Sequence, residues 1–263
     1  HRASGYPVDV LDRDALGALE PDIRLEGDEI VAAQFPAEGW VDATELVEAL
    51  LARAAAMGAQ VVTATVDALA TGSGRVTEVG LRSGERLAAD IVLLAAGPQT
   101  EGLAALAGVA LPMAPTPGLL AITSPLSTSI RHVVHAGRVT LRPAGGGRLL
   151  LSSRAVDAEL DPSTTTIDAD AAPCRDLLAR AARVVRGLDD ARIEMARIGI
   201  RSVARDGLPV AGFAAELANL YLLVSHSGAT LAPILGRLGA AELLGEPQAK
   251  LAPYRPDRFR GAA

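Results

Sequence analysis

Hydrophobic residues recur every three or four positions in three stretches of the chain, and this period is typical of helices that bury one face. The stretches predict helices over residues 42–57, 173–185 and 230–244, with a shorter helix after Asp12. The first has the clearest ends, because Asp42 can cap it with Glu45 three positions on, and Gly58 can end it. The apolar positions expected to form its buried face are Leu46, Ala49, Leu50, Ala54 and Met57.

Runs of apolar and β-branched residues between turn signals predict the strands. They cover residues 29–35, 60–66, 76–81, 85–88, 91–95, 119–123, 130–134, 138–141, 148–151, 191–203 and 220–224. The run at 91–95 is apolar at every position, so both of its faces are expected to be buried. Tight turns are expected at Ser83-Gly84, at 72–74 and at 145–147, where glycine supplies the conformations that turns need.

The order of these elements predicts two interleaved domains. Strands and helices alternate in residues 41–109 and 201–263, which indicates an α/β layer with a mostly parallel sheet. Short strands broken by Pro and Gly fill residues 110–200 and predict an antiparallel sheet, with residues 1–40 as its edge and linker. The fold class is therefore mixed α/β and α+β, and clefts between such domains commonly bind ligands.

Composition narrows the function. The 263 residues carry a net charge of −6, which argues against a nucleic-acid surface. The single cysteine, Cys174, excludes an internal disulfide and a multi-cysteine metal site, and no metal site is predicted. No apolar run reaches the ~18 residues of a membrane span and no signal peptide is visible, so the cytoplasm is the expected location. The chain opens with His1 and reads like the middle of a domain, so we expect preceding sequence to be missing or to lie on another chain.

A polar corner separates the apolar strand at 220–224 from the last long helix. It reads Ser225-His226-Ser227-Gly228. Such a corner places the free N–H groups and the positive end of the helix dipole at one edge of the sheet, where a planar ligand or developing negative charge is favoured. The alternative is an ordinary turn with a serine cap and a solvated histidine.

Arg201 stands in an apolar strand with Ile198, Ile200 and Val203 around it. A guanidinium in such surroundings needs a partner, because its desolvation is otherwise costly. A bound carboxylate held by two parallel hydrogen bonds would supply one. Pairing with a distant Asp or Glu is the alternative explanation.

Several segments, in order, resemble the superfamily of D-amino-acid, glycine and sarcosine oxidases, which are FAD-dependent enzymes that oxidise C–N bonds of small amines. The segments are WVDATELVEALLARAAAMGAQV, IVLLAAGPQT, LPMAPTPGLL, LRPAGGGRLLLS, GIRSVARDGLPVAG, SHSGATLAP and LAPYRPDRF. The resemblance implies a partial FAD-binding, Rossmann-like domain interleaved with an antiparallel substrate domain. It also implies hydride transfer from a small amine or amino acid to the flavin, followed by hydrolysis of the imine.

The resemblance also implies roles for particular residues. Arg201 would hold the substrate carboxylate, and Val66 would meet the FAD adenosine region through its backbone. Non-covalently bound FAD would be contacted by Val66, Ala96, Gly97, His226, Ser227, Gly228, Ala229, Thr230 and Leu231. Ser202, Ala204 and Ser225 depart from the family's proline, threonine and glycine, and Thr140 replaces a common tyrosine. Cys174 is expected to be a structural thiol, and His132 and His135 to be surface or hairpin residues.

One family feature is missing, the N-terminal G-x-G-x-x-G that anchors the FAD pyrophosphate. The glycines at 72–74 and 145–147 lie between strands and do not fit it. Three hypotheses remain: an FAD-dependent amine or amino-acid oxidase or dehydrogenase whose first part is absent, a non-catalytic or split subunit whose FAD site needs a partner chain carrying that segment, or a degenerate fold without flavin.

Overall fold

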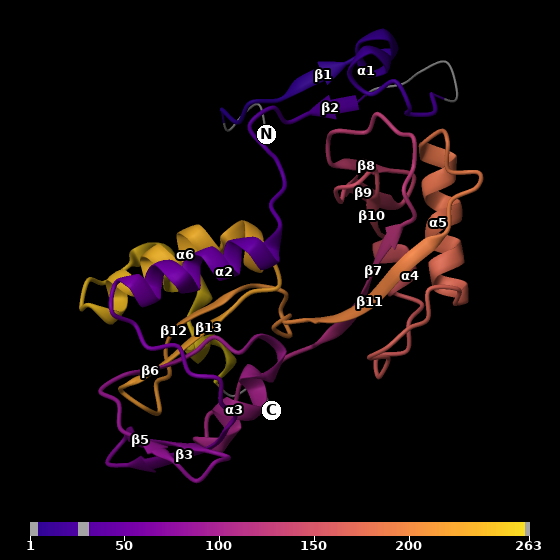
Figure 1. The fold of residues 1–263 in the computed structure, drawn as a ribbon. Helices are drawn as coiled ribbons and strands as arrows, with labels where there is room; N and C mark the ends of the chain where they lie inside the picture. Colours follow the sequence, from indigo (N-terminus) through magenta and orange to yellow (C-terminus); the bar gives the residue numbers. More distant parts are fainter. Residues whose placement is uncertain (1–4, 26–31, 261–263) are drawn as a thin grey trace. The chain divides into compact units, whose positions relative to one another are not determined.

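The computed structural model describes residues 5–25 and 32–260, which form two compact units (Figure 1). Unit 1 contains residues up to Trp40 together with Pro117–Ile200, and unit 2 contains Val41–Thr116 together with the residues from Arg201 on. The chain therefore crosses between the units three times. Elements in each unit are formed by segments far apart in the sequence.

Unit 1 is built on a five-stranded sheet of order β11-β7-β10-β9-β8. The pairs β7/β10, β9/β10 and β8/β9 are antiparallel. Helix α5 packs against β9 and β10, and its buried residues include Cys174 and Leu177. The elements are β7 (Thr116–Thr123), β8 (Val134–Ala136), β9 (Val139–Pro143), β10 (Leu149–Ser152), α4 (Arg154–Asp157), α5 (Ala172–Val184) and β11 (Ile193–Arg201).

The N-terminal part of unit 1 is a small hairpin with one helix. It comprises β1 (Asp9–Leu11), α1 (Arg13–Leu19) and β2 (Ala32–Gln34), and β1 and β2 are antiparallel. Asp12 caps α1 by accepting a hydrogen bond from the Ala15 N–H, so the helix begins where the sequence predicted. Of the strand predicted at residues 29–35, the first three residues lie outside the described part of the chain.

Unit 2 contains two three-stranded sheets. In the sheet β12-β13-β6, β13 is antiparallel to β12 and parallel to β6, so the predicted parallel layer is only partly parallel here. The sheet β3-β4-β5 is a meander of two hairpins. The elements are α2 (Ala43–Ala56), β3 (Val66–Gly72), β4 (Arg75–Leu81), β5 (Arg86–Leu87), β6 (Val92–Leu94), η2 (Gly97–Gln99), α3 (Thr100–Leu106), β12 (Val210–Phe213), β13 (Leu220–Val224), α6 (Gly228–Leu243), η3 (Ala249–Tyr254) and η4 (Pro256–Phe259).

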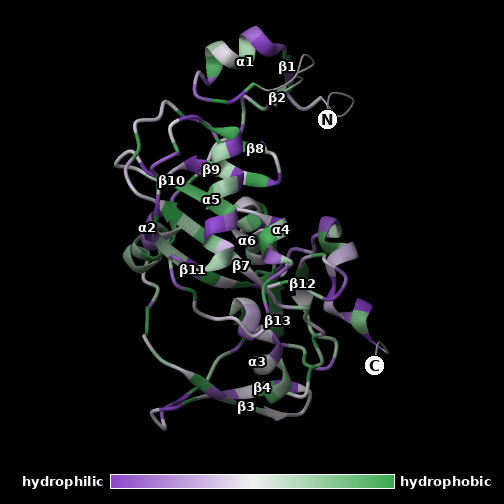
Figure 2. Cartoon of the chain, turned by 90° about the vertical axis from the view of Figure 1, so that its right-hand side faces the viewer, coloured by the Kyte–Doolittle hydropathy of each residue, from purple (hydrophilic) through white to green (hydrophobic). Residues whose placement is uncertain are grey.

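The core of unit 2 lies around β13, which reads Leu-Tyr-Leu-Leu-Val and is mostly hydrophobic (Figure 2). Leu220 and Leu222 pack with β6 and α3, while Ala211 of β12 packs with Leu235 and Leu238 of α6. Asn219 precedes β13 and is buried within this layer. Its side-chain oxygen accepts a hydrogen bond from the Val76 N–H. Its side-chain nitrogen donates to the Val76 carbonyl and to the Asp90 carbonyl. The meander is thereby attached to the central strand.

The structure corrects the predicted surroundings of α2. Asp42 caps the helix through the N–H groups of Thr44 and Glu45, as predicted, but no residue of the helix is buried. Leu50 is 57% exposed and Met57 is 73% exposed. An apolar stripe specifies which face can be buried, yet burial also needs a packing partner, and the described residues do not cover this face.

Three predicted strands also differ. Residues 60–65 belong to no strand: the pairing of β3 with β4 begins only at Val66, and before it the Thr65 carbonyl accepts a hydrogen bond from the Arg82 N–H. Strand β6 is an edge strand in the described sheet, with Ile91 41% and Leu93 43% exposed, so it is not buried on both faces. The strand expected at 130–134 forms later, as β8, because Glu20 engages the backbone of Arg131 and His132 instead.

Candidate functional site

Two of the predicted site segments lie at the same edge of the central sheet of unit 2. Strands β6 and β13 are parallel neighbours, and Leu94 is paired with Leu222. Ala96 and Gly97 follow the end of β6, and the corner at Ser225 follows the end of β13. Because parallel strands end at the same edge, the pairing brings these backbone segments together. In open sheets this is the edge at which ligands usually bind.

The corner itself is open and leads directly into α6. Its capping residue, Ser227, makes no side-chain cap to the helix, and its N–H is bonded to Ser225 Oγ at 3.2 Å. His226 is exposed, and its Nδ1 lies 2.9 Å from Ser227 Oγ. Gly228, Ala229 and Thr230 are exposed, so the first-turn N–H groups of α6 carry no side-chain cap and are available as donors.

Two glycines leave room for a flat ligand at this edge. Gly97 has φ +58, a conformation that L side chains rarely adopt, and no heavy atom lies within 4 Å of the Cβ it lacks. Gly228 likewise has no heavy atom within 4 Å of its missing Cβ. A donor set of backbone N–H groups beside open glycine positions fits a flavin, whose ring carries acceptor oxygens and gains negative charge on reduction.

Arg201 is the last residue of β11 and is half-buried. The residue after it connects this strand end to the corner, since Ser202 Oγ donates a hydrogen bond of 3.1 Å to the Ser225 carbonyl. Proline could not make this bond, so the serine that departs from the family pattern links two predicted site segments.

Val66 lies apart from these contacts in the described structure. It begins β3, pairs with Leu81 of β4 and packs at the margin of the unit 2 core. Its proposed contact with the adenosine part of FAD therefore stays a prediction.

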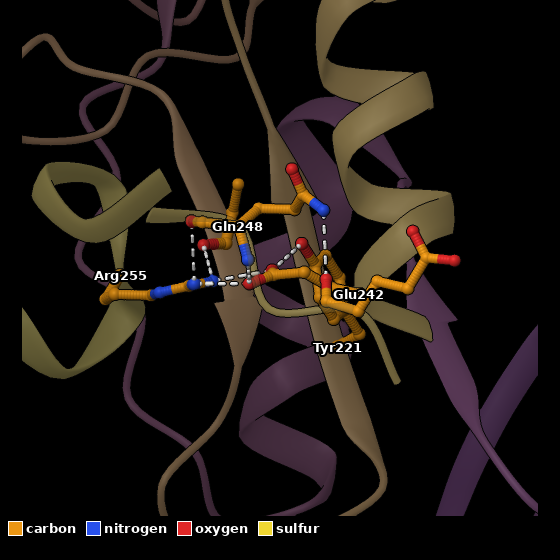
Figure 3. A network of polar contacts seen from close by, with 6 residues as sticks. Tyr221, Glu242, Gln248 and Arg255 are labelled. Carbon is orange, nitrogen blue, oxygen red and sulfur yellow. Dashed lines mark hydrogen bonds and ion pairs between the residues drawn. The ribbon is translucent and has the colours of Figure 1, made fainter. Parts of the chain in front are cut away.

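A network of polar residues at the other end of α6 was not found from the sequence (Figure 3). The carboxylate of Glu242 accepts hydrogen bonds from Tyr221 Oη at 2.8 Å, from Arg255 Nη1 at 2.6 Å and from the Gln248 N–H at 3.2 Å, and Arg255 Nη2 bonds its second oxygen. The Arg255 hydrogen bonds lower the pKa of Glu242, whereas burial and then the bond to Glu242 raise the pKa of Tyr221. The network attaches the C-terminal tail, Gln248–Arg260, to α6 and β13.

The remaining titratable candidates have structural surroundings. His132 Nδ1 lies 2.5 Å from Oε1 of Glu20, a side chain that is 2% exposed, while the His132 side chain is 43% exposed, so the ring lies at the surface and anchors the residue that ends α1. His135 is exposed and bonds Thr140 Oγ1. Cys174 is buried, and burial raises its thiol pKa, which fits the predicted structural thiol.

Metal-ligand clusters and membrane-spanning helices are both absent from the described part of the chain. Within residues 5–25 and 32–260, no three His, Cys, Asp or Glu side chains are grouped so as to hold a metal ion. No helix in these ranges has the length and apolar character needed to cross a membrane.

Comparison with known proteins identifies the family. The sequence profile of the DAO family, described as FAD dependent oxidoreductase, matches residues 1–242. The chain belongs to this family. A glycine oxidase of Geobacillus kaustophilus (strain HTA426) is 30% identical over 245 residues, which cover 91% of this chain and 62% of the relative. This chain thus spans less than two thirds of that relative's length.

The structure agrees with the family assignment. The crystal structure of glycine oxidase from Geobacillus kaustophilus superposes with a TM-score of 0.85 at 27% identity, covering 98% of this chain and 68% of that one. One component of an opine oxidase from Rhizobium meliloti is 29% identical over 142 residues, or 54% of this chain and 36% of the relative. The resemblance seen in the sequence motifs and the mixed fold class are therefore confirmed, and FAD is the cofactor of the family.

Proposed function

We propose that this chain forms the larger part of an FAD-dependent enzyme that oxidises the C–N bond of a small amine or amino acid. The observation that carries the proposal is the parallel pairing of β6 and β13, which brings Ala96, Gly97 and the corner to one sheet edge. The similarity to glycine oxidase supports an amino-acid substrate. A cytoplasmic location is part of the proposal.

The chain's own residues would hold the flavin by backbone groups. The first-turn N–H groups of α6, from Gly228 on, would donate to the acceptor edge of the ring, and His226 and Ser227 would support that edge. Ala96 and Gly97 would pass close to the cofactor, and no heavy atom lies within 4 Å of the Cβ that Gly97 lacks. Bound FAD would supply the electron acceptor for the hydride leaving the substrate carbon, and water would hydrolyse the imine.

Arg201 would bind the substrate carboxylate and thereby orient the C–H bond. A guanidinium holds a carboxylate by two parallel N–H···O bonds, which fixes the orientation as well as the position of the substrate. Its place at the end of β11, one residue before the Ser202 bond to the corner, supports this role. Catalysis of this kind depends on positioning and on flavin electronics more than on a protein base.

The FAD site would be completed by a segment carrying the pyrophosphate-binding glycines, either elsewhere in the same protein or on a partner chain. Three features of unit 2 support such a segment. The apolar face of α2 is exposed, the apolar residues Val61 and Val62 are exposed and belong to no strand, and β6 has an edge free of strands in the described sheet. A strand added along β6 would pair with that edge.

A second candidate is one component of a heteromeric oxidase, and the match to an opine oxidase component favours it. The two candidates differ in where the completing segment lies. The intact mass of the native polypeptide and the identity of any co-purifying chain distinguish them. A partner chain containing G-x-G-x-x-G would support the heteromeric enzyme, whereas the same motif in the same polypeptide would support a single-chain enzyme.

The visible absorption spectrum of the native protein tests the proposal. We expect the flavin band in the blue, and we expect glycine, other amino acids or small secondary amines to bleach it under anaerobic conditions. Protein that stays colourless after addition of FAD, with the completing segment present, would instead support a degenerate fold. Flavin that no amine or amino acid reduces would contradict C–N oxidation.

Gly228→Leu tests the corner, and Gly236→Leu is its matched control. Both glycines lie in α6, both are exposed, and neither has a heavy atom within 4 Å of its missing Cβ, so the two positions are matched in the room they leave for a side chain. Only the residue at the start of the helix would meet the flavin. We expect flavin content to fall in Gly228→Leu and to stay at the wild-type level in Gly236→Leu. Equal flavin content in the two variants would remove the corner from the site.

Arg201→Ala tests the proposed binding of the substrate carboxylate by Arg201. We expect KM for a carboxylate substrate to rise by the equivalent of roughly 2–5 kcal/mol of lost binding, while flavin stays bound. Arg201→Lys keeps the charge but not the two parallel bonds, so its KM should fall between those of wild type and Arg201→Ala. An unchanged KM in Arg201→Ala would exclude Arg201 from the substrate site.

A further inference from the structure

The last motif of the sequence, LAPYRPDRF, has no part in the proposed chemistry, yet both of its arginines make specific contacts. Arg255 bonds Glu242 and the Ala211 carbonyl, and so holds the tail against α6 and β12. This attachment fixes the start of η4, because Pro256 directly follows Arg255. Arg258, one turn further on, is thereby presented to the loop between β11 and β12.

Arg258 donates hydrogen bonds to two residues of this loop, Asp206 and Leu208. Its Nε donates to Asp206 Oδ2 at 2.7 Å and its Nη2 donates to Asp206 Oδ1 at 3.1 Å, which is the two-pronged pairing that guanidinium and carboxylate favour. Nη2 also donates to the Leu208 carbonyl at 3.3 Å. The side chain of Arg258 is only 18% exposed and stacks on Phe259, so the pair is partly shielded from water. The bond from Arg258 lowers the pKa of Asp206.

The other end of the same loop reaches the corner. Ser202 Oγ donates to the Ser225 carbonyl, the first residue of the corner. Between the two ends, Ala204 is buried and forms an isolated bridge with Met113. The loop is therefore a short, well-anchored connection from the C-terminal tail to the backbone that leads into α6.

We propose that Asp206 and Arg258 are positioning residues for the corner: by fixing the loop, they hold Ser202 where it orients the Ser225 carbonyl and the N–H groups that follow. The expected effect on FAD binding rests on the proposed flavin site. The coupling between the C-terminal tail and the corner does not depend on flavin. Neither residue touches the reacting atoms in this assignment.

The test compares Arg258→Gln, Asp206→Asn and the double variant in the native protein. Arg260→Gln is the matched control, because Arg260 lies on the same tail and pairs at 3.2 Å with Glu216, outside the loop. We expect each single variant to weaken FAD binding by the flavin-free protein roughly three- to tenfold, measured well below the melting temperature. The double variant should be no weaker than the worse single variant, because the two residues act as one unit.

Hydrogen exchange in the flavin-free protein provides a second readout. We expect Arg258→Gln to speed exchange in peptides covering residues 202–208 and 225–231, where Ser227 and Leu231 have bonded amides, and Arg260→Gln to leave both unchanged. Faster exchange at 202–208 alone would overturn the inference, since the loop would then move without the corner.

The outcomes separate this inference from the proposed function. Wild-type protein without flavin would contradict the proposed function, and the exchange data would still decide the coupling. If wild-type protein binds flavin but Arg258→Gln and Arg260→Gln have equal affinity for FAD, the inference is overturned. The proposed function is then unaffected.

Discussion

We expect Arg255→Ala to destabilise the protein much more than the substitution of an exposed arginine would. The substitution leaves the Glu242 carboxylate, which is 7% exposed, with the Tyr221 hydroxyl and the Gln248 N–H but without its counter-charge. Breaking a buried pair in this way typically costs ~3–5 kcal/mol. Arg255 is 29% exposed, so water can partly replace it, and we expect a loss of about 3 kcal/mol at pH 7.

The loss of stability in Arg255→Ala should be larger at neutral pH than in acid. In the wild type the pKa of Glu242 is lowered, so its contribution is present above the unfolded pKa and is lost as pH falls through the folded pKa. Without Arg255, burial disfavours the charged carboxylate, and protonation relieves the cost. The stability difference between wild type and variant should therefore be largest at neutral pH and shrink as pH falls below about 5.

Urea unfolding followed by far-UV circular dichroism measures the loss, and Trp40 fluorescence reports on unit 1, which contains Trp40. Arg260→Ala serves as the control, because its exposed pair should contribute within about 1 kcal/mol. A difference between wild type and Arg255→Ala below about 1 kcal/mol at pH 7, or one that grows in acid, would refute this reasoning.

Two further substitutions test the packing of unit 2. Asn219→Ala leaves the buried backbone of Val76 without its bonds, and we expect a loss of about 2–4 kcal/mol in urea unfolding, whereas a loss under 1 kcal/mol would show that the backbone finds other partners. Gly212 has φ +150, and an added Cβ would lie 2.9 Å from Arg255 Cδ. Gly212→Ala should cost about 2–4 kcal/mol, and a melting temperature equal to that of wild type would show that Arg255 moves aside without losing Glu242.

Local signals explain which parts of the fold were predictable. The cap at Asp42 and the hairpin turn at Ser83-Gly84 involve residues a few positions apart, so their geometry is fixed by neighbouring side chains and backbone. The apolar runs at 91–95 and 220–224 predicted two strands in a mostly parallel layer, but the pairing of β6 with β13 was not predicted. The prediction failed where burial depends on a remote partner, as at the exposed faces of α2 and β6.

The polar contacts of the site were harder to predict for the same reason. The approach of Arg255 to Glu242, and that of Ser202 to the Ser225 carbonyl, depend on the final packing of distant segments. His132 carried no local sign that Glu20 would be buried against it. The repeated arginines of LAPYRPDRF and the acidic residue in the last turn of α6, where a helix dipole favours a cation, were the available signals.

The interleaving of the units has a consequence for synthesis of the protein on the ribosome. Strand β6 is made before Pro117–Ile200, but its partner β13 is made after that whole segment. Unit 1 can therefore fold completely while the first segment of unit 2, Val41–Thr116, still exposes apolar surface. Slow translation or a shortage of chaperones should harm unit 2 first, through aggregation of nascent chains rather than through any loss of finished enzyme.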